Sequence, residues 1–222
     1  MEFDFSPVWA GWRELAHGTL ITIEVTTGAI VLGCVIGMLV GLGRLDPKRT
    51  VVYGICTAYV AFIRGTPLLV QLFIWFFGLP YFGINLPAFF CGVVGMGMYS
   101  GAYVSEIVRG AIQSVARGQL EAARSLGMPD RVAMRHVIVP QAVIRMIPPL
   151  GNEFIALIKN SSLVSLLTIA DLMHEGQKII SVSYRSLEVY LAVALVYFVL
   201  TNLTGLALRV TERRLGVGGL VN

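Results

Sequence analysis

The stretch Gly118–Pro140 reads GQLEAARSLGMPDRVAMRHVIVP and is the longest strongly polar run in an otherwise mostly apolar chain. Its first part, from Gln119 to Leu126, consists mostly of good helix formers. Gly127 follows at a place where a helix C-terminus favours a residue that tolerates positive φ. Pro129 then stands where a second helix can begin, because its missing N–H costs nothing in a first turn. The stretch therefore predicts a helix, a sharp turn and a second helix.

The composition of the whole chain indicates a membrane protein. Of its 222 residues, 56% are hydrophobic and 14% are charged, whereas a soluble domain carries about 25% charged residues. We therefore expect an all-α polytopic membrane protein in which residues 1–222 form a single transmembrane domain. The net charge of +4 comes mostly from residues in short loops, a pattern that orients membrane helices and does not indicate nucleic-acid binding.

Five apolar segments predict about five transmembrane helices. They are expected at about residues 19–42, 51–77, 88–108, from 137 onward, and 189–208. Within the first segment, glycines at positions 33, 37 and 41 lie on one helix face, where another helix backbone can approach closely.

Two interruptions are expected within these segments. The second segment contains Arg64-Gly65-Thr66-Pro67, and proline removes a backbone hydrogen bond, so a kink is predicted there. The fourth segment should be broken at Pro148-Pro149 for the same reason. Residues 163–173 are apolar but too short to span a bilayer and predict a capping or re-entrant helix. Residues 174–188 are polar.

The distribution of basic residues predicts the orientation in the membrane. Residues 44–49, 110–136 and 209–214 form the basic loops, and they follow the first, third and fifth segments. Basic loops stay in the cytoplasm, which places the N-terminus outside and the C-terminus inside. The polar stretch belongs to the second of these loops and is therefore expected to face the cytoplasm.

No pattern in the sequence indicates catalysis. The chain lacks a GxxxxGK[ST] phosphate-binding loop, an HExxH motif and a Cys/His cluster. Its cysteines, at positions 34, 56 and 91, lie in apolar stretches and are interpreted as small core residues. We expect neither an enzyme, nor a metal site, nor a cofactor in this chain.

Polar residues of the third and fourth segments are the candidates for substrate binding. Glu153, Leu157 and Asn160 recur at helical spacing and share one face, with Glu153 and Asn160 about 10 Å apart along the axis. A carboxylate at membrane depth is costly unless it meets a cation or lines water, so it marks a functional site by default. The structural alternative is that Glu153 pairs with Arg64 or Arg145 and stabilises the broken helix.

Several spaced motifs resemble the permease subunits of ATP-binding-cassette (ABC) importers. Glu121-Ala122-Ala123, Gly127 and Val137-Ile138-Val139-Pro140 resemble the EAA loop of that family. The segments RGTPLLVQ at 64–71, AYVSEIVRG at 102–110, PPLGNE at 148–153 and KNSSL at 159–163 resemble its polar amino acid branch. The similarity covers roughly residues 18–210. Asn160 stands where that branch often has Asp, and Tyr99 where it often has Asn.

The resemblance implies a fold, a function and partners. The fold would be that of a type I ABC importer permease in the bacterial inner membrane, and the function would be uptake of polar amino acids. Glu121, Ala122, Ala123 and Gly127 would belong to a coupling helix that docks on a separate ATPase subunit. The substrate would bind near Glu153, Leu157, Asn160, Tyr99 and Ser100.

The implied partners are two ATPase subunits that bind ATP and Mg²⁺, a second permease chain, identical or different, and an extracytoplasmic amino acid-binding protein. Membrane lipid surrounds the helices. Two other classes of protein stay open at this stage. A secondary transporter also uses broken helices at mid-membrane, but usually with inverted repeats. A structural or channel subunit would explain the glycine faces, but not the polar helix–turn–helix.

Overall fold

The computed structural model describes residues 3–48 and 50–215, and within these ranges the chain is mostly helical, with short turns and loops and no strand. Three helices are individually long and apolar enough to cross a membrane, and up to five spans result if each of two bent helix pairs counts as one. The expectation of an all-α fold with about five spans is confirmed. The element bounds are α1 Ser6–Ala10, α2 Trp12–Gly43, α3 Thr50–Gly65, α4 Leu68–Phe73, α5 Ala88–Ser114, α6 Arg117–Ser125, α7 Asp130–Ala133, α8 Val139–Asn160, α9 Leu172–Ser183 and α10 Ser186–Arg214.

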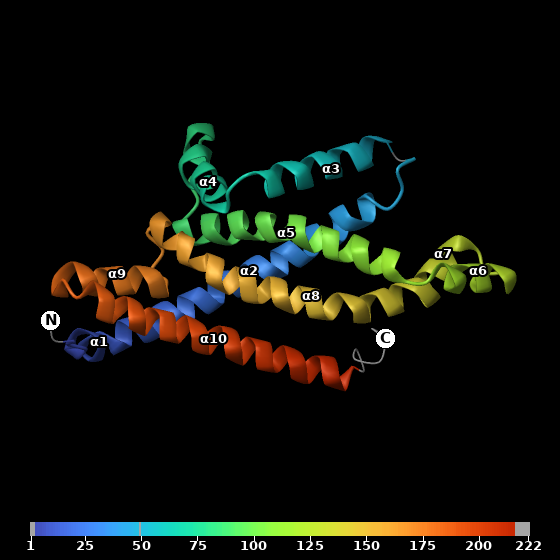
Figure 1. Ribbon diagram of the computed structural model, residues 1–222. Coiled ribbons are helices and arrows are strands. Elements are labelled where there is room, and N and C mark those ends of the chain that lie inside the picture. Colours follow the sequence, from blue (N-terminus) through green and yellow to red (C-terminus); the bar gives the residue numbers. More distant parts are fainter. Residues whose placement is uncertain (1–2, 49, 216–222) are drawn as a thin grey trace.

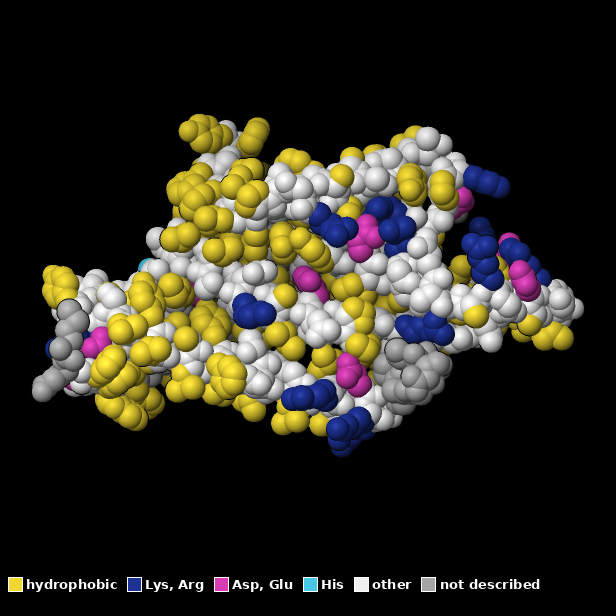
Figure 2. Space-filling model, viewed as in Figure 1, with side chains coloured by type: hydrophobic (Ala, Val, Ile, Leu, Met, Phe, Trp, Pro, Cys, Tyr) yellow, Lys and Arg dark blue, Asp and Glu magenta, His cyan; other side chains and the backbone are white. Residues whose placement is uncertain are grey.

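The long helices α2, α5, α8 and α10 lie side by side along the long dimension of the molecule (Figure 1). Helices α6 and α7 project from one end, and α1 and α9 lie at the other. On the face seen in Figure 2, most of the Lys and Arg side chains gather in the half nearest α6 and α7. The basic loops predicted from the sequence therefore lie toward one end of the bundle.

Helices α2 and α5 form the most extensive helix pair of the fold, and glycines make this possible. A Cβ atom at Gly37 would come within 2.5 Å of Val104 and within 2.9 Å of the Gly101 carbonyl oxygen. A Cβ at Gly101 would in turn meet Ile36 at 2.8 Å. Glycines of both helices thus face each other's backbones, which confirms the packing role predicted for the glycine face of the first span.

The predicted kink at Arg64–Pro67 is confirmed and is a sharp bend. Helix α3 ends at Gly65 and α4 begins at Leu68. The chain bends by 108° between Thr50–Gly65 and the helical segment Leu68–Phe82. Pro67 has no N–H to donate to the Ile63 carbonyl, and the buried Gln71 side chain takes its place: its Nε2 donates to the Ile63 oxygen at 2.8 Å and to the Thr66 oxygen at 3.1 Å. The bend is therefore stabilised by a side chain four residues beyond the proline.

The predicted break at Pro148-Pro149 is wrong. Helix α8 runs from Val139 to Asn160 with both prolines inside it. Adjacent prolines free the carbonyls of Ile144 and Arg145, but a helix packed among other helices tolerates such gaps. Here tertiary packing against α5 and α10 outweighs the local preference of the prolines.

Two other boundaries differ from those expected. The first spanning helix, α2, begins at Trp12 and not near residue 19. In place of one short helix over 163–173, the chain forms a 3-10 helix at Ser161–Leu167 and then α9 at Leu172–Ser183, which occupies most of the polar segment 174–188. The buried Asp171 begins α9, because its carboxylate accepts hydrogen bonds from the N–H groups of Met173 and His174.

Candidate functional site

The polar stretch forms the predicted pair of helices, α6 and α7, joined by a tight turn. Gly127 adopts φ +79°. Its N–H donates to the Arg124 carbonyl at 2.9 Å, and the Met128 N–H donates to the Ala123 carbonyl at 3.1 Å. This pair of hydrogen bonds is the Schellman arrangement, which ends a helix with a left-handed residue that is usually glycine. The predicted conformation of Gly127 is confirmed.

An ion pair connects the two short helices on their exposed side. Arg124 Nε lies 2.8 Å from Asp130 Oδ1, so the last turn of α6 is connected to the first residue of α7. The hydrogen bond from Arg124 lowers the pKa of the Asp130 carboxyl below its usual value, so the pair stays charged at neutral pH.

One side of α6 is free to meet another protein. Glu121 and Ala122 are exposed and Leu126 at the tip is 80% exposed, whereas Ala123 is buried against the rest of the chain. A cavity of about 560 Å³ lies between this helix pair and the ends of α2 and α5, lined among others by Leu45, Ile112, Leu120, Met134 and Ile138. The structure therefore presents the EAA segment at one end of the bundle, with three of its four predicted coupling residues accessible.

Helix α8 is connected to the base of this helix pair. The Arg145 guanidinium donates to the backbone carbonyl and the hydroxyl of Ser114, the last residue of α5. Helix α6 begins only three residues later, at Arg117, so Arg145 connects α8 to the segment that leads into α6. Arg145 therefore does not pair with Glu153, although the structural alternative proposed Arg145 as one of two partners for that carboxylate.

The predicted substrate residues lie along α8 and the facing side of α5. The Glu153 side chain lies close to Ser100 and Tyr99. Ser100 is fully buried. Glu153 forms no ion pair within the described part of the chain: Arg145 donates to Ser114, and Arg64 lies 3.6 Å from Glu106. The structure thus brings Glu153, Tyr99 and Ser100 together.

The other two predicted substrate residues are placed differently. Leu157 is fully buried and belongs to the hydrophobic core with Val25, Leu72 and Met96. Asn160 is the last residue of α8 and is half-buried. For these two residues, and for Glu153, Tyr99 and Ser100, contact with a substrate stays a prediction.

A second polar cluster continues from the first along α5. Tyr99 donates a hydrogen bond to Tyr103, with 3.1 Å between the hydroxyl oxygens, and the Arg64 guanidinium lies over the Tyr103 ring at 5.3 Å from its centroid. Arg64 Nη1 is also 3.6 Å from Glu106 Oε1. Polar side chains therefore extend from Glu153 in the middle of α8 to Glu106 near the end of α5.

Glu106 is the centre of an ion-pair cluster that sequence reasoning did not identify in full. Its Oε1 accepts from Arg44 Nη1 at 2.6 Å, and its Oε2 accepts from Arg109 Nη2 at 2.7 Å. Arg44 follows α2 in the chain, so the cluster connects the end of α2 to α5. Arg109 lies three residues after Glu106 and is recognisable from helical spacing, but the contact with Arg44 depends on how α2 and α5 pack.

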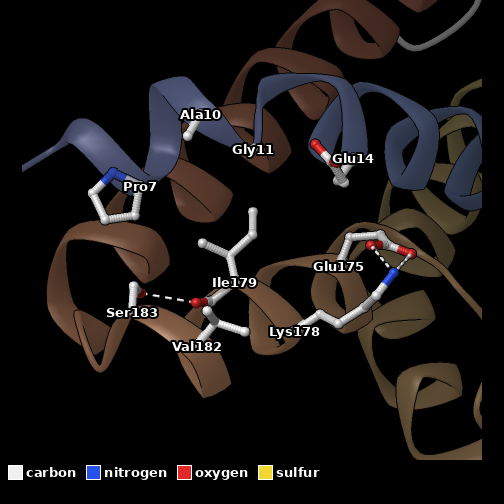
Figure 3. Close-up of a pocket in the computed structure, with 9 residues that line it drawn as sticks. All are labelled: Pro7, Ala10, Gly11, Glu14, Glu175, Lys178, Ile179, Val182 and Ser183. Atoms are coloured by element: carbon white, nitrogen blue, oxygen red, sulfur yellow. Dashed lines mark hydrogen bonds and ion pairs between the residues drawn. The ribbon is translucent and has the colours of Figure 1, made fainter.

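A cavity of about 330 Å³ lies at the opposite end of the molecule, between α1 and α9 (Figure 3). Apolar side chains line one part of it, and Ile179 points toward Gly11. At the other part, Lys178 Nζ lies 3.0 Å from the nearly buried carboxylate of Glu175. None of the residues predicted to bind substrate or ATPase lines this cavity.

The chain is similar to transport proteins along nearly its whole length. The glutamine transport system permease protein GlnP of Escherichia coli is 36% identical over 219 residues, 98% of this chain and 100% of GlnP. The L-cystine transport system permease protein TcyB of Bacillus subtilis is 38% identical over 92% of this chain and 87% of its own length. A crystal structure of an amino acid ABC transporter with histidines matches with a TM-score of 0.91 and 42% identity, covering 96% of this chain and 100% of that one. The MetNI methionine ABC transporter shares the fold, with a TM-score of 0.77 at 20% identity.

The family model matches residues 29–217, a range that contains α5, the α6–α7 pair and α8. Members of this family are permease subunits of ABC importers that work with ATPase and substrate-binding protein partners and are not enzymes themselves. The chain belongs to the family of binding-protein-dependent transport system inner membrane components.

Proposed function

We propose that this permease subunit imports polar amino acids across a bacterial inner membrane. The relatives named above are described as glutamine and cystine permeases, and the solved structure at 42% identity is described as an amino acid transporter. The observation that carries the proposal is the Glu153 carboxylate, which lies beside Ser100 and Tyr99 and forms no ion pair with a described residue. Such a carboxylate suits the ammonium group that every free amino acid carries.

The complete transporter would contain two copies of a separate ATPase, which bind ATP and Mg²⁺, and a second permease chain, identical or different. An extracytoplasmic binding protein would deliver the amino acid. In this arrangement α6 and α7 face the cytoplasm, the N-terminus lies outside, and the C-terminus lies in the cytoplasm. The opposite placement of α1 and the α6–α7 pair along the bundle supports this orientation (Figure 1).

Coupling would act through the exposed side of α6. Closure of the two ATPase subunits would move Glu121, Ala122 and the Gly127 turn together, because the hydrogen bonds of the turn and the Arg124–Asp130 ion pair connect α7 to α6. The contact of Arg145 with Ser114 would transmit this movement to α8. Glu153 lies on the same helix, eight residues further along, so the substrate cavity would change shape when the ATPases close.

A substitution at Gly127 tests the coupling role. Gly127→Val places a β-branched side chain at φ +79°, which costs about 1 kcal/mol or more and misaims α6. We expect the variant to insert and fold but to lose amino acid uptake in vesicles reconstituted with the ATPase and binding protein, with ATPase assembly or activity disturbed. Normal uptake would show that the turn is only a loop.

Gly83 offers a matched control. It has φ +76°, and a Cβ would find open space at both positions, so Gly83→Val creates the same backbone strain. Gly83 lies between α4 and α5, on the loop predicted to face outside. We expect Gly83→Val to retain ATPase assembly and coupled hydrolysis. If both variants lost ATPase assembly and coupled hydrolysis equally, the cause would be backbone strain and not a coupling role of Gly127.

A further inference from the structure

We propose that Arg64 binds the α-carboxylate of the transported amino acid, opposite the site at which Glu153 binds the ammonium. The inference deepens the proposed function and rests on it. A free amino acid carries both charges on one carbon atom, and a site with an acidic group alone would leave the carboxylate unpaired in a poorly solvated environment. A cation close to Glu153 would pair with this carboxylate if Glu153 holds the ammonium.

The charges around Glu106 leave Arg64 available for such a role. Both carboxylate oxygens of Glu106 already accept short hydrogen bonds, one from Arg44 and one from Arg109. Arg64 approaches to only 3.6 Å, beyond normal hydrogen-bond length, and its guanidinium makes no hydrogen bond to any described residue. Three arginines around one carboxylate leave an excess of two positive charges. An additional anion would therefore be stabilised beside Arg64, the arginine that is farthest from the Glu106 carboxylate.

The position of Arg64 also suits a ligand. Its side chain is 47% exposed, against 10% for Arg44 and 35% for Arg109. Stacking on the Tyr103 ring orients the planar guanidinium while its N–H groups stay free at the edges. A guanidinium held in this way presents a fork of donors that matches the two oxygens of a carboxylate.

Arg64 and Glu153 flank the same pair of tyrosines. Tyr99 is hydrogen-bonded to Tyr103 one helical turn further along α5, and the Arg64 guanidinium lies over the Tyr103 ring. Glu153 is near Tyr99 and Ser100, and Arg64 is over Tyr103, so the two charged groups are offset by about one turn, or about 5 Å along α5. This offset suits the two charged groups of one α-amino acid.

The test compares ligands with and without the carboxylate. The permease is purified in nanodiscs with its ATPase partner and without the binding protein, and dissociation constants are measured by calorimetry for L-glutamine and L-glutaminamide, and for L-histidine and L-histidinamide. Wild type should bind each acid more tightly than its amide. Arg64→Gln should weaken binding of the acid about 10- to 100-fold, the range for a charge-assisted hydrogen-bonded pair, and change amide binding less than about 3-fold. The affinity of Arg64→Lys for each acid should fall between those of wild type and Arg64→Gln.

Arg109→Gln serves as the matched control. It removes one positive charge from the same Glu106 carboxylate. Along α5, however, Arg109 follows Glu106, whereas the two tyrosines precede it. We expect it to change binding of acid and amide by the same small factor. The amide affinities also report whether each variant is folded.

Two results would overturn the proposal. Equal weakening of acid and amide by Arg64→Gln would show that Arg64 acts only through Tyr103 and Glu106. A failure of all four compounds to bind wild type would overturn the proposed substrate class and the role of Arg64 together. The role of Glu153 is read separately from Glu153→Gln: unchanged acid binding in that variant, with the selective loss in Arg64→Gln intact, would reject the ammonium site and retain the carboxylate site.

Discussion

Among single residues, Asn160 has the clearest consequence for which amino acids are transported. It ends α8, two turns beyond Glu153, and offers an amide that both donates and accepts hydrogen bonds. If Glu153 binds the ammonium, a cationic side chain would require a second acid, which Asn160 does not supply. A glutamine-like or other neutral polar side chain fits this arrangement better than arginine or lysine. The alternative is that Glu153 binds a basic side chain and the backbone holds the ammonium.

The substitution Asn160→Asp distinguishes these two arrangements, because it adds one charge at nearly constant size. Under the first, uptake of arginine or lysine should rise relative to glutamine by a factor that reflects on the order of 1 kcal/mol, or about 5-fold. The measurement is competition uptake in reconstituted vesicles with a binding protein that accepts both classes. An unchanged ratio, together with full activity of Glu153→Gln, would move the substrate site away from this side of α8.

Among the elements, the contact between α2 and α5 is the most sensitive to substitution. Gly101 of α5 has Ile36 Cβ at 2.9 Å and the Tyr59 hydroxyl at 3.1 Å from the position of an added Cβ. Neither atom can move freely. The Ile36 Cβ is attached directly to the backbone, and the Tyr59 hydroxyl donates a hydrogen bond to the Met98 carbonyl. A methyl group here separates the two helices.

We therefore expect Gly101→Ala to destabilise the protein by about 1–3 kcal/mol, the usual cost of overpacking. Gly110, nine residues further along the same helix, has no atom within 4 Å of an added Cβ. Gly110→Ala should be neutral or stabilising by up to about 1 kcal/mol, because alanine favours helix more than glycine. Thermal unfolding of both variants in the same detergent checks the pair. If the two variants changed the unfolding temperature by a similar amount, the close contact at Gly101 would contribute nothing, and only helix propensity would matter.

For the whole molecule, orientation in the membrane is the property that can be tested most directly. The bundle has the α6–α7 pair at one end and α1 at the other, with the basic loops toward the former (Figures 1 and 2). Asn85, before α5, and Ser125, at the end of α6, are both exposed. They are separated by the length of α5, 27 residues or about 40 Å, which exceeds the hydrocarbon thickness of about 30 Å.

Cysteine labelling tests this orientation in a version of the chain from which Cys34, Cys56 and Cys91 have been replaced. We expect Asn85→Cys to react with a membrane-impermeant thiol reagent added outside intact cells. Ser125→Cys should react only after the membrane is made permeable. Reversed labelling would contradict the orientation predicted from the basic loops and, with it, the assignment of α6 to the cytoplasm.

Features that depend on local chemistry could be predicted from the amino-acid sequence alone. Apolar length fixed the number of spans, because hydrocarbon leaves a backbone few alternatives to a helix. The Gly127 turn and the start of α7 near Pro129 followed from local backbone preferences, and the resemblance of spaced motifs led to the family. The neighbouring positions of Glu153, Ser100 and Tyr99 were anticipated only as a grouping of polar residues on two spans.

Only the tertiary structure decided the features that depend on long-range packing. Helix α8 continues through Pro148-Pro149 because neighbouring helices hold it, and no local rule shows this. The Arg44–Glu106 ion pair joins residues 62 positions apart, and its existence depends on the close approach that glycines allow between α2 and α5. The replacement of the Pro67 hydrogen bond by Gln71 and the free edges of Arg64 likewise arise from side-chain geometry, which spacing along the chain does not specify.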